Sequence, residues 1–475
     1  MTRHGELLID GTFVGGPCDQ STPKAVIRSP WSGHVATTAA EGGWAELRDA
    51  LEAAHDAFPT YRETPRRERQ ALLRKIASLI REERADLADL LVQEIGKPVT
   101  LALGEVDRMA IVFDQAADLL ATWGLEQLPA DLDPRGDRAR LYVERRPLGV
   151  VYGFVPYNWP YNLAAHKIAP ALAVGCPLVL KCSPLAPVST LELARLCHRA
   201  GVPAGVLNAW NGDDEAAGRA LEDERIAVFS FTGSERVGWM LKERSKARKV
   251  VLELGGNASA IVANDADLDR AVAKLIPGAF GYAGQVCISV QHIWVHRDVA
   301  DAFRERFLAA VPALGDPADP KTICGPLISP EAADKVRGLI HDALEKGATR
   351  PVGDDGEGNR LPPTVLENVP NGARIASEEA FGPVVTLAPF DTLEEAYAEV
   401  NGSRYGIHAA VFTSSLNTAE TAYRSLEVGG VIVNDSPSLR LDAMPYGGVR
   451  RSGRGREGLR YAMDEFTEPK ALLIA

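Results

Sequence analysis

The sequence lacks any segment that would hold the chain in a membrane. It has no uninterrupted apolar run of about 18 residues, the length that a membrane-spanning helix requires. The first residues, MTRHGELLIDGTFVGG, contain no apolar core of a signal peptide. We therefore expect a cytoplasmic protein with no membrane partner.

Basic residues are fewer than acidic residues. Lysine and arginine total 52 against 64 aspartates and glutamates, so the formal net charge is −12. A surface of this sign argues against nucleic acid or an anionic membrane as the main partner, but it leaves room for a local cationic pocket.

Cysteine is rare and shows no pattern. The six cysteines form no CxxC pair and no cysteine–histidine spacing suited to zinc, so we expect free thiols and no metal site. Burial in the core is the ordinary role of a free cysteine. Cys287, within GYAGQVCISVQ, therefore needs further support before it is assigned any chemistry.

The residues that are present follow the pattern of a large α/β protein. A chain of 475 residues exceeds what one core supports, so two or three domains are expected. Amphipathic helices are predicted between residues 61 and 122. Short apolar runs then alternate with helical stretches over 145–257, which is typical of a parallel sheet with crossover helices.

A second α/β region is predicted from about residue 258 to 435. It contains predicted helices over 265–284 and 298–314 and a predicted strand over 288–296. The last residues, RYAMDEFTEPKALLIA, predict a turn of helix and then an extended segment. Such a segment can pair with a sheet edge, including that of another subunit.

Three polar side chains stand where a reaction could occur. In parallel sheets, ligands bind at the carboxyl ends of the strands. Asn158 follows one predicted strand and could serve an oxyanion hole, although an ordinary turn asparagine is the simpler interpretation. Glu253 is embedded in the otherwise apolar run KVVLEL, where it is either a general base or part of an ion pair. Cys287 lies in a predicted loop, and a nucleophilic thiolate there would need such an amide and such a base.

Two further positions suggest a nucleotide. Lys181 follows the run PLVL and could hold a ribose hydroxyl or a phosphate, or be a solvated charge. Gly233 and Ser234 open a predicted helix, where free N–H groups form a generic phosphate site. Without a G-x-G-x-x-G sequence this is a weak dinucleotide signal.

Taken together, eight ordered motifs carry a resemblance to a known family. They are PYNWP, LKCSP, FTGSERVG, LELGGN, GQVC, EEAFGPV (378–384), YGIHAAVFT (405–413) and MPYGGVRRSGRGREG (444–458). With them the chain resembles the NAD(P)-dependent aldehyde dehydrogenase superfamily from end to end.

The resemblance implies the α/β aldehyde dehydrogenase fold in three parts. A Rossmann-like cofactor domain would comprise 1–123 and 145–252, and an α/β catalytic domain would comprise 253–458. A small bridging β-segment, 124–144 and 459–475, would make the chain a homodimer or homotetramer.

The resemblance also implies a mechanism. The Cys287 thiolate would attack the aldehyde, Asn158 and the Cys287 N–H would hold the oxyanion, and Glu253 would activate the water that hydrolyses the thioester. The cofactor would be NAD or NADP. Pro184 replaces a glutamate that often excludes the 2′-phosphate, so NADP should be tolerated. The implied cofactor-binding residues are Lys181, Ser183, Gly233, Ser234, Glu379, Phe381, Pro156, Tyr157 and Leu254.

The expected substrate is a small hydrophilic or anionic aldehyde, such as a phosphorylated or phosphonate aldehyde. The phrases NLAAHKIAPALA, GQVCISVQ and MPYGGV resemble the branch that handles lactaldehyde, glyceraldehyde phosphates and phosphonoaldehydes. Arg108 would contribute positive charge, unless it forms a surface salt bridge with Glu105 or Asp107. The predicted substrate-binding residues are Arg108, His166, Leu163, Val286, Ile288, Ser289 and Arg440.

Alternative functions remain open at this point. Succinate-semialdehyde enzymes usually carry arginine where His166 stands, and broad aliphatic or aromatic specificity would favour an apolar funnel. A CoA-acylating enzyme would typically lack Glu253. A simple thiol hydrolase would not need TGSERVG and Glu379, and an inactive binding protein would be expected to lose Cys287, Glu253 or Asn158.

Overall fold

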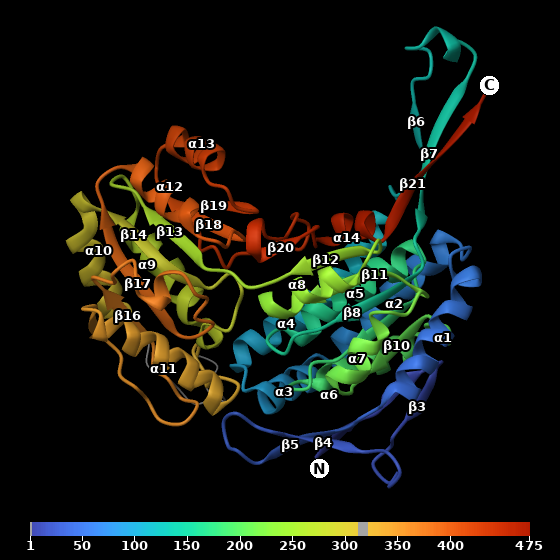
Figure 1. The fold of residues 1–475 in the computed structure, drawn as a ribbon, viewed down its shortest axis with the longest axis horizontal. Helices are drawn as coiled ribbons and strands as arrows, with labels where there is room; N and C mark the ends of the chain where they lie inside the picture. The colour runs from blue at the N-terminus through green and yellow to red at the C-terminus, as the bar shows by residue number, and fades with distance from the viewer. Residues whose placement is uncertain (1, 312–321) are drawn as a thin grey trace.

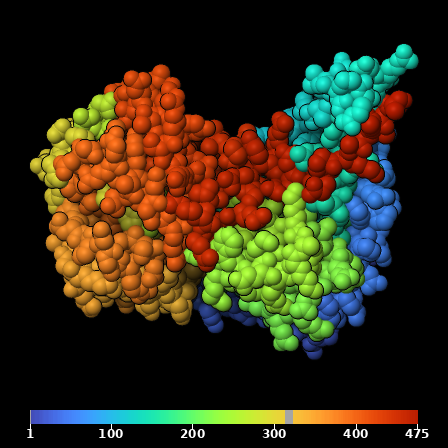
Figure 2. All heavy atoms as spheres, turned by 45° about the horizontal axis from the view of Figure 1, so that its top comes forward, coloured from blue at the N-terminus to red at the C-terminus, as the bar shows by residue number. Residues whose placement is uncertain are grey.

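The computed structural model describes residues 2–311 and 322–475, which form two lobes and a projecting arm (Figure 1). The first lobe contains most of the N-terminal half of the chain, and the second lobe contains the yellow and orange segments. The C-terminal segment, drawn in red, lies across the boundary between the lobes (Figure 2).

The first lobe is built on an eight-stranded sheet in the order β20-β12-β11-β8-β9-β10-β2-β3. Its five strands from β12 to β10 are parallel. Runs such as LVLK are buried along their whole length, as expected for parallel strands covered by helices on both faces. The bounds are β2 Leu7–Ile9, β3 Thr12–Val14, β8 Val150–Phe154, β9 Leu178–Lys181, β10 Leu207–Trp210, β11 Ile226–Thr232, β12 Lys249–Glu253 and β20 Gly453–Arg454.

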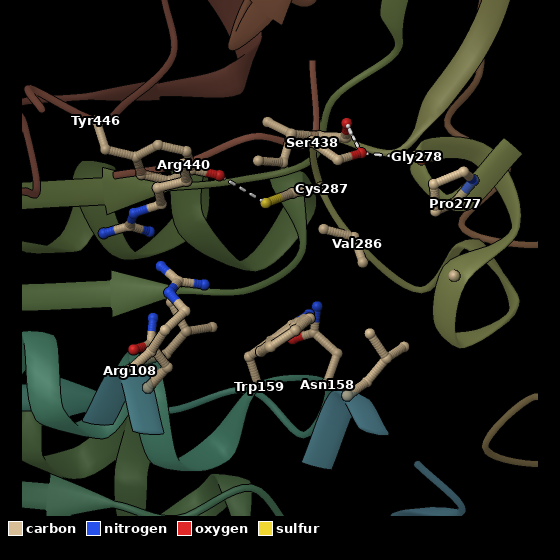
Figure 3. A pocket seen from close by; sticks show the side chains of 15 residues that line it. Arg108, Asn158, Trp159, Pro277, Gly278, Val286, Cys287, Ser438, Arg440 and Tyr446 are labelled. Atoms are coloured by element: carbon tan, nitrogen blue, oxygen red, sulfur yellow. Dashed lines mark hydrogen bonds between the residues drawn. The ribbon is translucent and has the colours of Figure 1, made fainter. Parts of the chain in front are cut away.

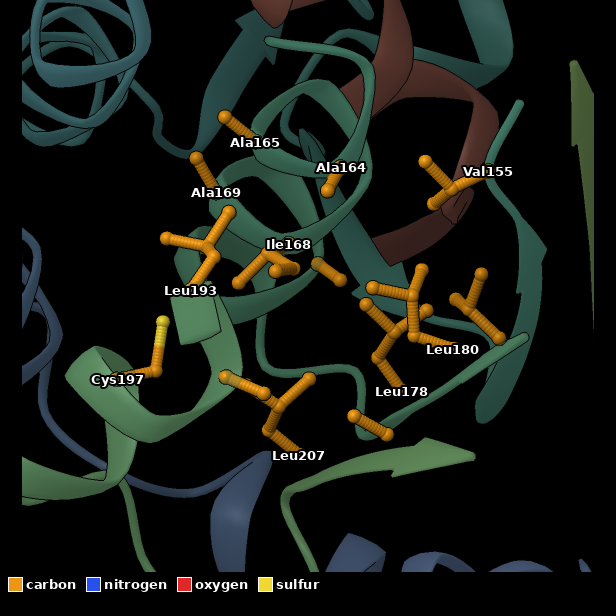
Figure 4. Packing of buried hydrophobic residues seen from close by; sticks show 14 of the residues in the cluster. Val155, Ala164, Ala165, Ile168, Ala169, Leu178, Leu180, Leu193, Cys197 and Leu207 are labelled. Carbon is orange, nitrogen blue, oxygen red and sulfur yellow. The ribbon is translucent and has the colours of Figure 1, made fainter. Parts of the chain in front are cut away.

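Helices pack on this sheet through small and branched apolar side chains. Ile168 and Leu193, from two helices, meet Leu178 of β9 in the core (Figure 4). The helices are α1 Trp44–Tyr61, α2 Arg66–Glu82, α3 Arg84–Ile95, α4 Val99–Leu119, α5 Pro160–Val174, α6 Pro187–Ala200, α7 Asp214–Ala220, α8 Glu235–Arg244 and α14 Leu459–Glu465. A small sheet, in the order β1-β5-β4, adds β1 Arg3–Gly5, β5 Val35–Ala40 and β4 Lys24–Arg28.

The second lobe holds a seven-stranded sheet in the order β15-β16-β17-β14-β13-β18-β19. Only β15 pairs in the antiparallel sense among the described strands of this sheet. The strands are β13 Ala258–Val262, β14 Val290–His296, β15 Thr349–Val352, β16 Thr364–Glu367, β17 Val384–Phe390, β18 His408–Phe412 and β19 Gly430–Val433. The helices are α9 Leu268–Phe280, α10 Arg297–Ala310, α11 Pro330–Glu345, α12 Leu393–Gly402 and α13 Leu416–Ser425.

The arm is a three-stranded antiparallel sheet in the order β21-β7-β6. Its strands are β6 Glu126–Leu128, β7 Arg140–Pro147 and β21 Thr467–Ile474. The predicted extended tail is therefore confirmed, and it pairs with β7 of its own chain along its full length. Leu472, Leu473 and Ile474 lie exposed on this strand at the edge of the sheet.

The sequence pattern predicted most of the central elements. The helices of 61–122 and the strand–helix alternation of 145–257 are confirmed, whereas β1 to β5 and α1 were not predicted. The helix predicted over 298–314 ends at Ala310, and residues 312–314 lie outside the described residues. The division into three domains stays a prediction, and β20 joins the first-lobe sheet although its residues were assigned to the catalytic part.

The described part of the chain contains no helix that is both long and apolar enough to cross a membrane.

Candidate active site

The candidate site lies between the lobes. Residues at the ends of β8 and β12 in the first lobe meet the loop before β14 and the loop after β19 in the second. Figure 3 shows Asn158, which follows β8, facing Cys287 and Arg440 of the second lobe. Asn158, Glu253 and Cys287, which were predicted to act together, line this region.

Cys287 lies in the loop between the 3₁₀ turn Gly281–Gly284 and β14. The loop approaches the LELGGN segment so closely that a Cβ at Gly256 would stand 2.3 Å from the Cys287 carbonyl oxygen. Its Sγ is 2.9 Å from the Tyr446 hydroxyl. Burial raises the pKa of Cys287 to about 12, and the hydrogen bond with Tyr446 opposes this rise.

Gln285, two residues earlier, fixes the conformation of this loop. Its side chain is fully buried, and its Oε1 accepts hydrogen bonds from Tyr157 Oη and the Ile328 N–H. Its Nε2 donates to the carbonyls of Tyr282 and Pro326. The sequence motif GQVC contained this residue, but no role was predicted for its side chain.

Asn158 reaches the same loop from the first lobe. Its Nδ2 donates one hydrogen bond to the Gln285 carbonyl at 2.8 Å. An amide nitrogen carries two hydrogens, so one remains for a ligand beside Cys287. The start of α5 next to it is held by Glu105, whose Oε1 accepts from the N–H groups of Tyr161 and Asn162.

Glu253 ends β12 and is 3% exposed. Neither of its carboxylate oxygens has a hydrogen-bond partner within the described residues. Burial, followed by the nearby Glu457 carboxylate, raises the pKa of Glu253 well above its usual range. A carboxylate in this condition is suited to accept a proton near neutral pH.

A buried cluster of charges adjoins Glu253. Lys167 Nζ donates to Ser230, to Thr232 and, at 3.1 Å, to Glu457 Oε1. Arg440 Nη2 donates to Glu457 Oε2 at 3.3 Å. Burial opposes ionisation of Glu457, but Lys167 and Arg440 prevail and lower its pKa to about 2. Lys167 and Glu457 were not predicted, although a lysine inside the apolar run of α5 was a signal of a buried ion pair.

Two cavities meet at the thiol. A cavity of about 220 Å³ is lined by the predicted residues Arg108, Leu163, Val286, Ile288 and Arg440, together with Cys287 and Asn158. Residues not predicted also line it, namely Leu101, Trp159, Asn162, Pro277, Gly278, Gly281, Ser438 and Tyr446.

Two predicted substrate residues do not line this cavity. His166 is buried behind it, and its Nε2–H donates to Asp442 Oδ1 at 2.9 Å. Ser289 points away, because its hydroxyl donates to the carbonyls of Gly278 and Ala279. The prediction of direct substrate contact is therefore wrong for both residues.

Arg108 is held by an aspartate that is remote in sequence. Its Nη2 lies 2.6 Å from Asp442 Oδ1, so the alternative pairing with Glu105 or Asp107 is wrong. Glu105 pairs instead with Lys97, and Asp107 with Arg84. In Figure 3 the guanidinium groups of Arg108 and Arg440 reach toward each other from opposite walls. Each guanidinium also pairs with a carboxylate, Arg108 with Asp442 and Arg440 with Glu457, so an anion between them would bind through N–H groups that these pairs leave free.

The second cavity, of about 300 Å³, opens on the other side of the thiol. Seven of its lining residues were predicted to bind cofactor: Pro156, Tyr157, Gly233, Ser234, Leu254, Glu379 and Phe381. Thr232, Gly255 and Lys335 also line it and were not predicted. Lys181 and Ser183 do not line it: Lys181 Nζ lies 3.4 Å from Asp214 Oδ1, and Ser183 Oγ accepts from the Leu185 N–H.

This second cavity fits one end of a nicotinamide dinucleotide. Ser234 is the N-cap residue of α8, and its hydroxyl makes no capping hydrogen bond within the described residues, so the helix N-terminus is available to an anion. Glu379 Oε1 accepts from the Gly256 N–H at 3.0 Å, and burial raises its pKa to about 7. A Cβ at Gly255 would stand 2.3 Å from Glu379 Oε2, so only glycine leaves this carboxylate in place.

Comparisons with known proteins agree with this geometry. The profile of the aldehyde dehydrogenase family matches residues 18–472, and the chain belongs to that family. It is 36% identical to a 3-sulfolactaldehyde dehydrogenase of Priestia aryabhattai, with all of both chains covered.

Two solved structures extend the comparison. Aldehyde dehydrogenase 21 of Physcomitrella patens, in complex with the product succinate, superimposes with a TM-score of 0.96 at 37% identity, covering 100% of this chain and 98% of the other. The NADP-dependent glyceraldehyde-3-phosphate dehydrogenase of Bacillus halodurans, complexed with NADP, gives 0.95 at 33% identity, covering 99% of each chain. The protein is thus an NAD(P)-dependent aldehyde dehydrogenase with the α/β fold of that family.

Proposed function

We propose that the enzyme oxidises a small hydrophilic aldehyde, preferably one that carries an anionic group such as a phosphate or a phosphonate. The observation that carries this proposal is the pair Arg108 and Arg440 on the walls of the cavity that ends at Cys287. Arg440 Nε has no hydrogen-bond partner among the described residues, and an arginine has five donors in all. The relatives named for 3-sulfolactaldehyde and glyceraldehyde 3-phosphate, both anionic aldehydes, support the same class of substrate.

In the proposed reaction, Cys287 is the nucleophile. Its sulfur donates an electron pair to the aldehyde carbon, the carbonyl pair moves to oxygen, and a thiohemiacetal forms. The free amide hydrogen of Asn158 and the Cys287 N–H stabilise that oxygen. Loss of hydride leaves a thioester, and Glu253 then removes a proton from the water that attacks it. The carboxylic acid departs and the thiolate is restored.

NAD or NADP supplies the hydride acceptor when it is bound. Glu379 would accept hydrogen bonds from ribose hydroxyls, and Phe381 and Leu254 would pack beside the ring. The N-terminus of α8 with Ser234 would hold the pyrophosphate. Lys181 and Ser183 remain proposed contacts of the adenosine half. Pro184 is exposed and neutral, so it presents no charge against a 2′-phosphate.

A broader substrate range has one observation in its favour. Leu101, Trp159, Leu163, Val286 and Ile288 give the cavity apolar walls between the two arginines. Such walls would also accept propanal or benzaldehyde. A CoA-acylating reaction is less well supported, because Glu253 is present and lies buried beside the thiol cavity.

A panel of aldehydes tests the proposal. Formation of reduced cofactor is measured with NAD or NADP and with propanal, benzaldehyde, lactaldehyde, succinate semialdehyde, glyceraldehyde 3-phosphate and phosphonoacetaldehyde. We expect the highest kcat/KM for the phosphate or phosphonate substrates. Arg108→Ala should lower that value by about 10- to 100-fold, as for a lost hydrogen bond to a charged group, and leave propanal unchanged.

The matched control is Arg84→Ala, which removes an arginine from the neighbouring ion pair with Asp107 outside the cavity. Equal loss for charged and neutral aldehydes in Arg108→Ala, or preference of the wild type for benzaldehyde, would overturn the anionic substrate and leave the dehydrogenase reaction in place.

We also propose that the arm forms an interface between copies of this chain. Its outer strand β21 leaves a row of backbone groups and three apolar side chains exposed. Such edges pair readily with another strand. Light scattering of the purified protein should give the mass of a dimer or tetramer, and a monomer would contradict this.

A further inference from the structure

Tyr446 makes the one side-chain hydrogen bond to the Cys287 sulfur that the described residues contain. The distance from Oη to Sγ is 2.9 Å, drawn as a dashed line in Figure 3. Either atom can donate while the sulfur is a thiol. Once the sulfur has lost its proton to solvent, only the phenol can donate. Burial raises the pKa of Tyr446 well above its usual range, so the phenol keeps its proton.

The position of this phenol is set by several independent contacts. The N–H of Tyr446 donates to the Glu457 carbonyl at 2.9 Å, and the N–H of Glu457 donates back at 2.6 Å. The ring packs edge-on against His408 at 5.4 Å and clusters with Ile288 and Ile407. Tyr446 is 3% exposed, so its hydroxyl is oriented before any ligand binds.

Arg440 strengthens this donor. Its guanidinium lies 3.7 Å from the centre of the Tyr446 ring, and its hydrogen bond to Glu457 holds it there. A positive charge over the ring draws electron density from the phenol and makes its O–H a better donor.

We infer that Tyr446 is a further catalytic residue, which donates a hydrogen bond to the Cys287 thiolate and so increases the fraction of reactive sulfur. This inference rests on the proposed role of Cys287 as nucleophile. No proton leaves Tyr446 in the step: the sulfur electron pair forms the bond to carbon, the sulfur loses its negative charge, and the hydrogen bond weakens. Arg440 is a positioning residue for the phenol.

The alternative is that Tyr446 only fills space, in which case phenylalanine would serve equally well. The two roles differ in their effect on the acidity of the thiol. Removing one hydrogen bond to a charged group should raise the thiol pKa by about one unit. The weaker acid is also the better nucleophile, with a Brønsted slope of about 0.4–0.5. Because the pKa of Cys287 is raised to about 12, the net result is alkylation about threefold slower throughout the range from about pH 6 to about pH 10.

The test follows alkylation of Cys287 by iodoacetamide in the full-length protein, from about pH 6 to about pH 10. Mass spectrometry of the peptide that contains Cys287 separates its reaction from that of the exposed Cys18. Tyr446→Phe is compared with Tyr397→Phe on α12, which makes the same chemical change at a buried hydroxyl that has no hydrogen-bond partner in the described part of the chain. Turnover is recorded over the same range of pH.

We expect Tyr446→Phe to alkylate about threefold more slowly near neutral pH and to shift the acidic limb of kcat/KM upward by about one unit. Tyr397→Phe should match the wild type. Alkylation rates of Tyr446→Phe that coincide with those of the wild type, or slowing that is accompanied by a lower melting temperature, would overturn the inference.

Cys287→Ser separates this outcome from failure of the proposed function. If Cys287→Ser abolishes turnover while Tyr446→Phe leaves both profiles unchanged, only the role of Tyr446 is wrong. If Cys287→Ser retains turnover, the proposed nucleophile is wrong, and the proposed role of Tyr446 is wrong as well.

Discussion

The backbone of Gly447 lies directly against the side chain of Glu253: a Cβ at residue 447 would stand 2.7 Å from Glu253 Oε1. Gly447 has a φ of 153° and follows Tyr446, so one short turn faces both the carboxylate and the thiol. The turn covers Glu253 without giving it a hydrogen bond. A carboxylate covered in this way is costly to ionise, and that cost is the origin of its raised pKa.

Replacing Glu253 with glutamine should stop the reaction after hydride transfer and before hydrolysis of the thioester. Hydride loss precedes thioester hydrolysis in the proposed reaction, so Glu253→Gln should release one reduced cofactor per subunit in a burst and then stall. Steady-state turnover should fall by about 10²- to 10⁴-fold, the range for loss of a general base. Rapid mixing with absorbance detection measures both phases. Continued steady turnover at the wild-type rate would show that another group activates the water.

The same substitution should stabilise the protein at neutral pH. Because the folded-state pKa of Glu253 is raised, its contribution to stability is present in full below the unfolded-state pKa of about 4.3 and is lost as pH rises through the folded-state pKa. Glu253→Gln removes this loss, so its melting temperature should exceed that of the wild type at neutral pH. The two should converge as pH falls toward 4. A pH-independent difference would contradict this linkage.

Asn158→Ala should remove one of two oxyanion donors. We expect turnover to fall by about 10²- to 10³-fold while cofactor affinity stays the same, because Asn158 reaches toward the Cys287 loop. Steady-state kinetics and cofactor titration together check this. A loss of less than tenfold would mean that the Cys287 N–H alone is sufficient.

Cofactor binding should tighten as pH rises through neutrality. Burial raises the pKa of Glu379 to about 7, and only its ionised form accepts two hydrogen bonds from a ribose. Between pH of about 6 and about 8 the ionised fraction rises about tenfold, so the Kd for cofactor should fall by a similar factor. Calorimetry at constant ionic strength measures this, and Glu379→Gln should give a flat profile. A pH-dependent Kd in Glu379→Gln would assign the effect to another group.

The ion pair of Lys97 and Glu105 should be essential for stability. Both side chains are fully buried, and Lys97 Nζ also lies 3.7 Å from the centre of the Trp159 ring. Lys97→Met leaves the Glu105 carboxylate without its partner, so we expect a loss of about 3–5 kcal/mol. Thermal unfolding measures it, with Arg67→Met as the control. Arg67 pairs with Glu68 on the surface, and its loss should cost at most about 1 kcal/mol.

The strand-end rule explains why the centre of the site could be predicted from the sequence. Asn158 and Glu253 each follow or end a strand of one parallel sheet, so their common location was implied by the strand–helix alternation. The short strands β1 to β5, of three to six residues, carry too little periodicity to be recognised.

The surroundings of the site could not be predicted, because they depend on contacts between distant segments. Arg108 meets Asp442 across 334 positions, so its sequence neighbours Glu105 and Asp107 gave the wrong partner. The direction in which neighbouring side chains point could not be predicted either. Ile288 and Ser289 are adjacent, but only Ile288 lines the cavity, while Ser289 turns back to the end of α9.

The meeting of two cavities at Cys287 has a stereochemical consequence. In the proposed thiohemiacetal, the former aldehyde carbon carries four different groups: sulfur, oxygen, hydrogen and the substrate chain. Asn158 fixes the oxygen, the cavity of Arg108 and Arg440 takes the chain, and the hydrogen faces the cavity of Glu379 and Phe381. Only one configuration at this carbon places the oxygen, the chain and the hydrogen in this way. An achiral aldehyde would therefore react through a single stereoisomer of the thiohemiacetal.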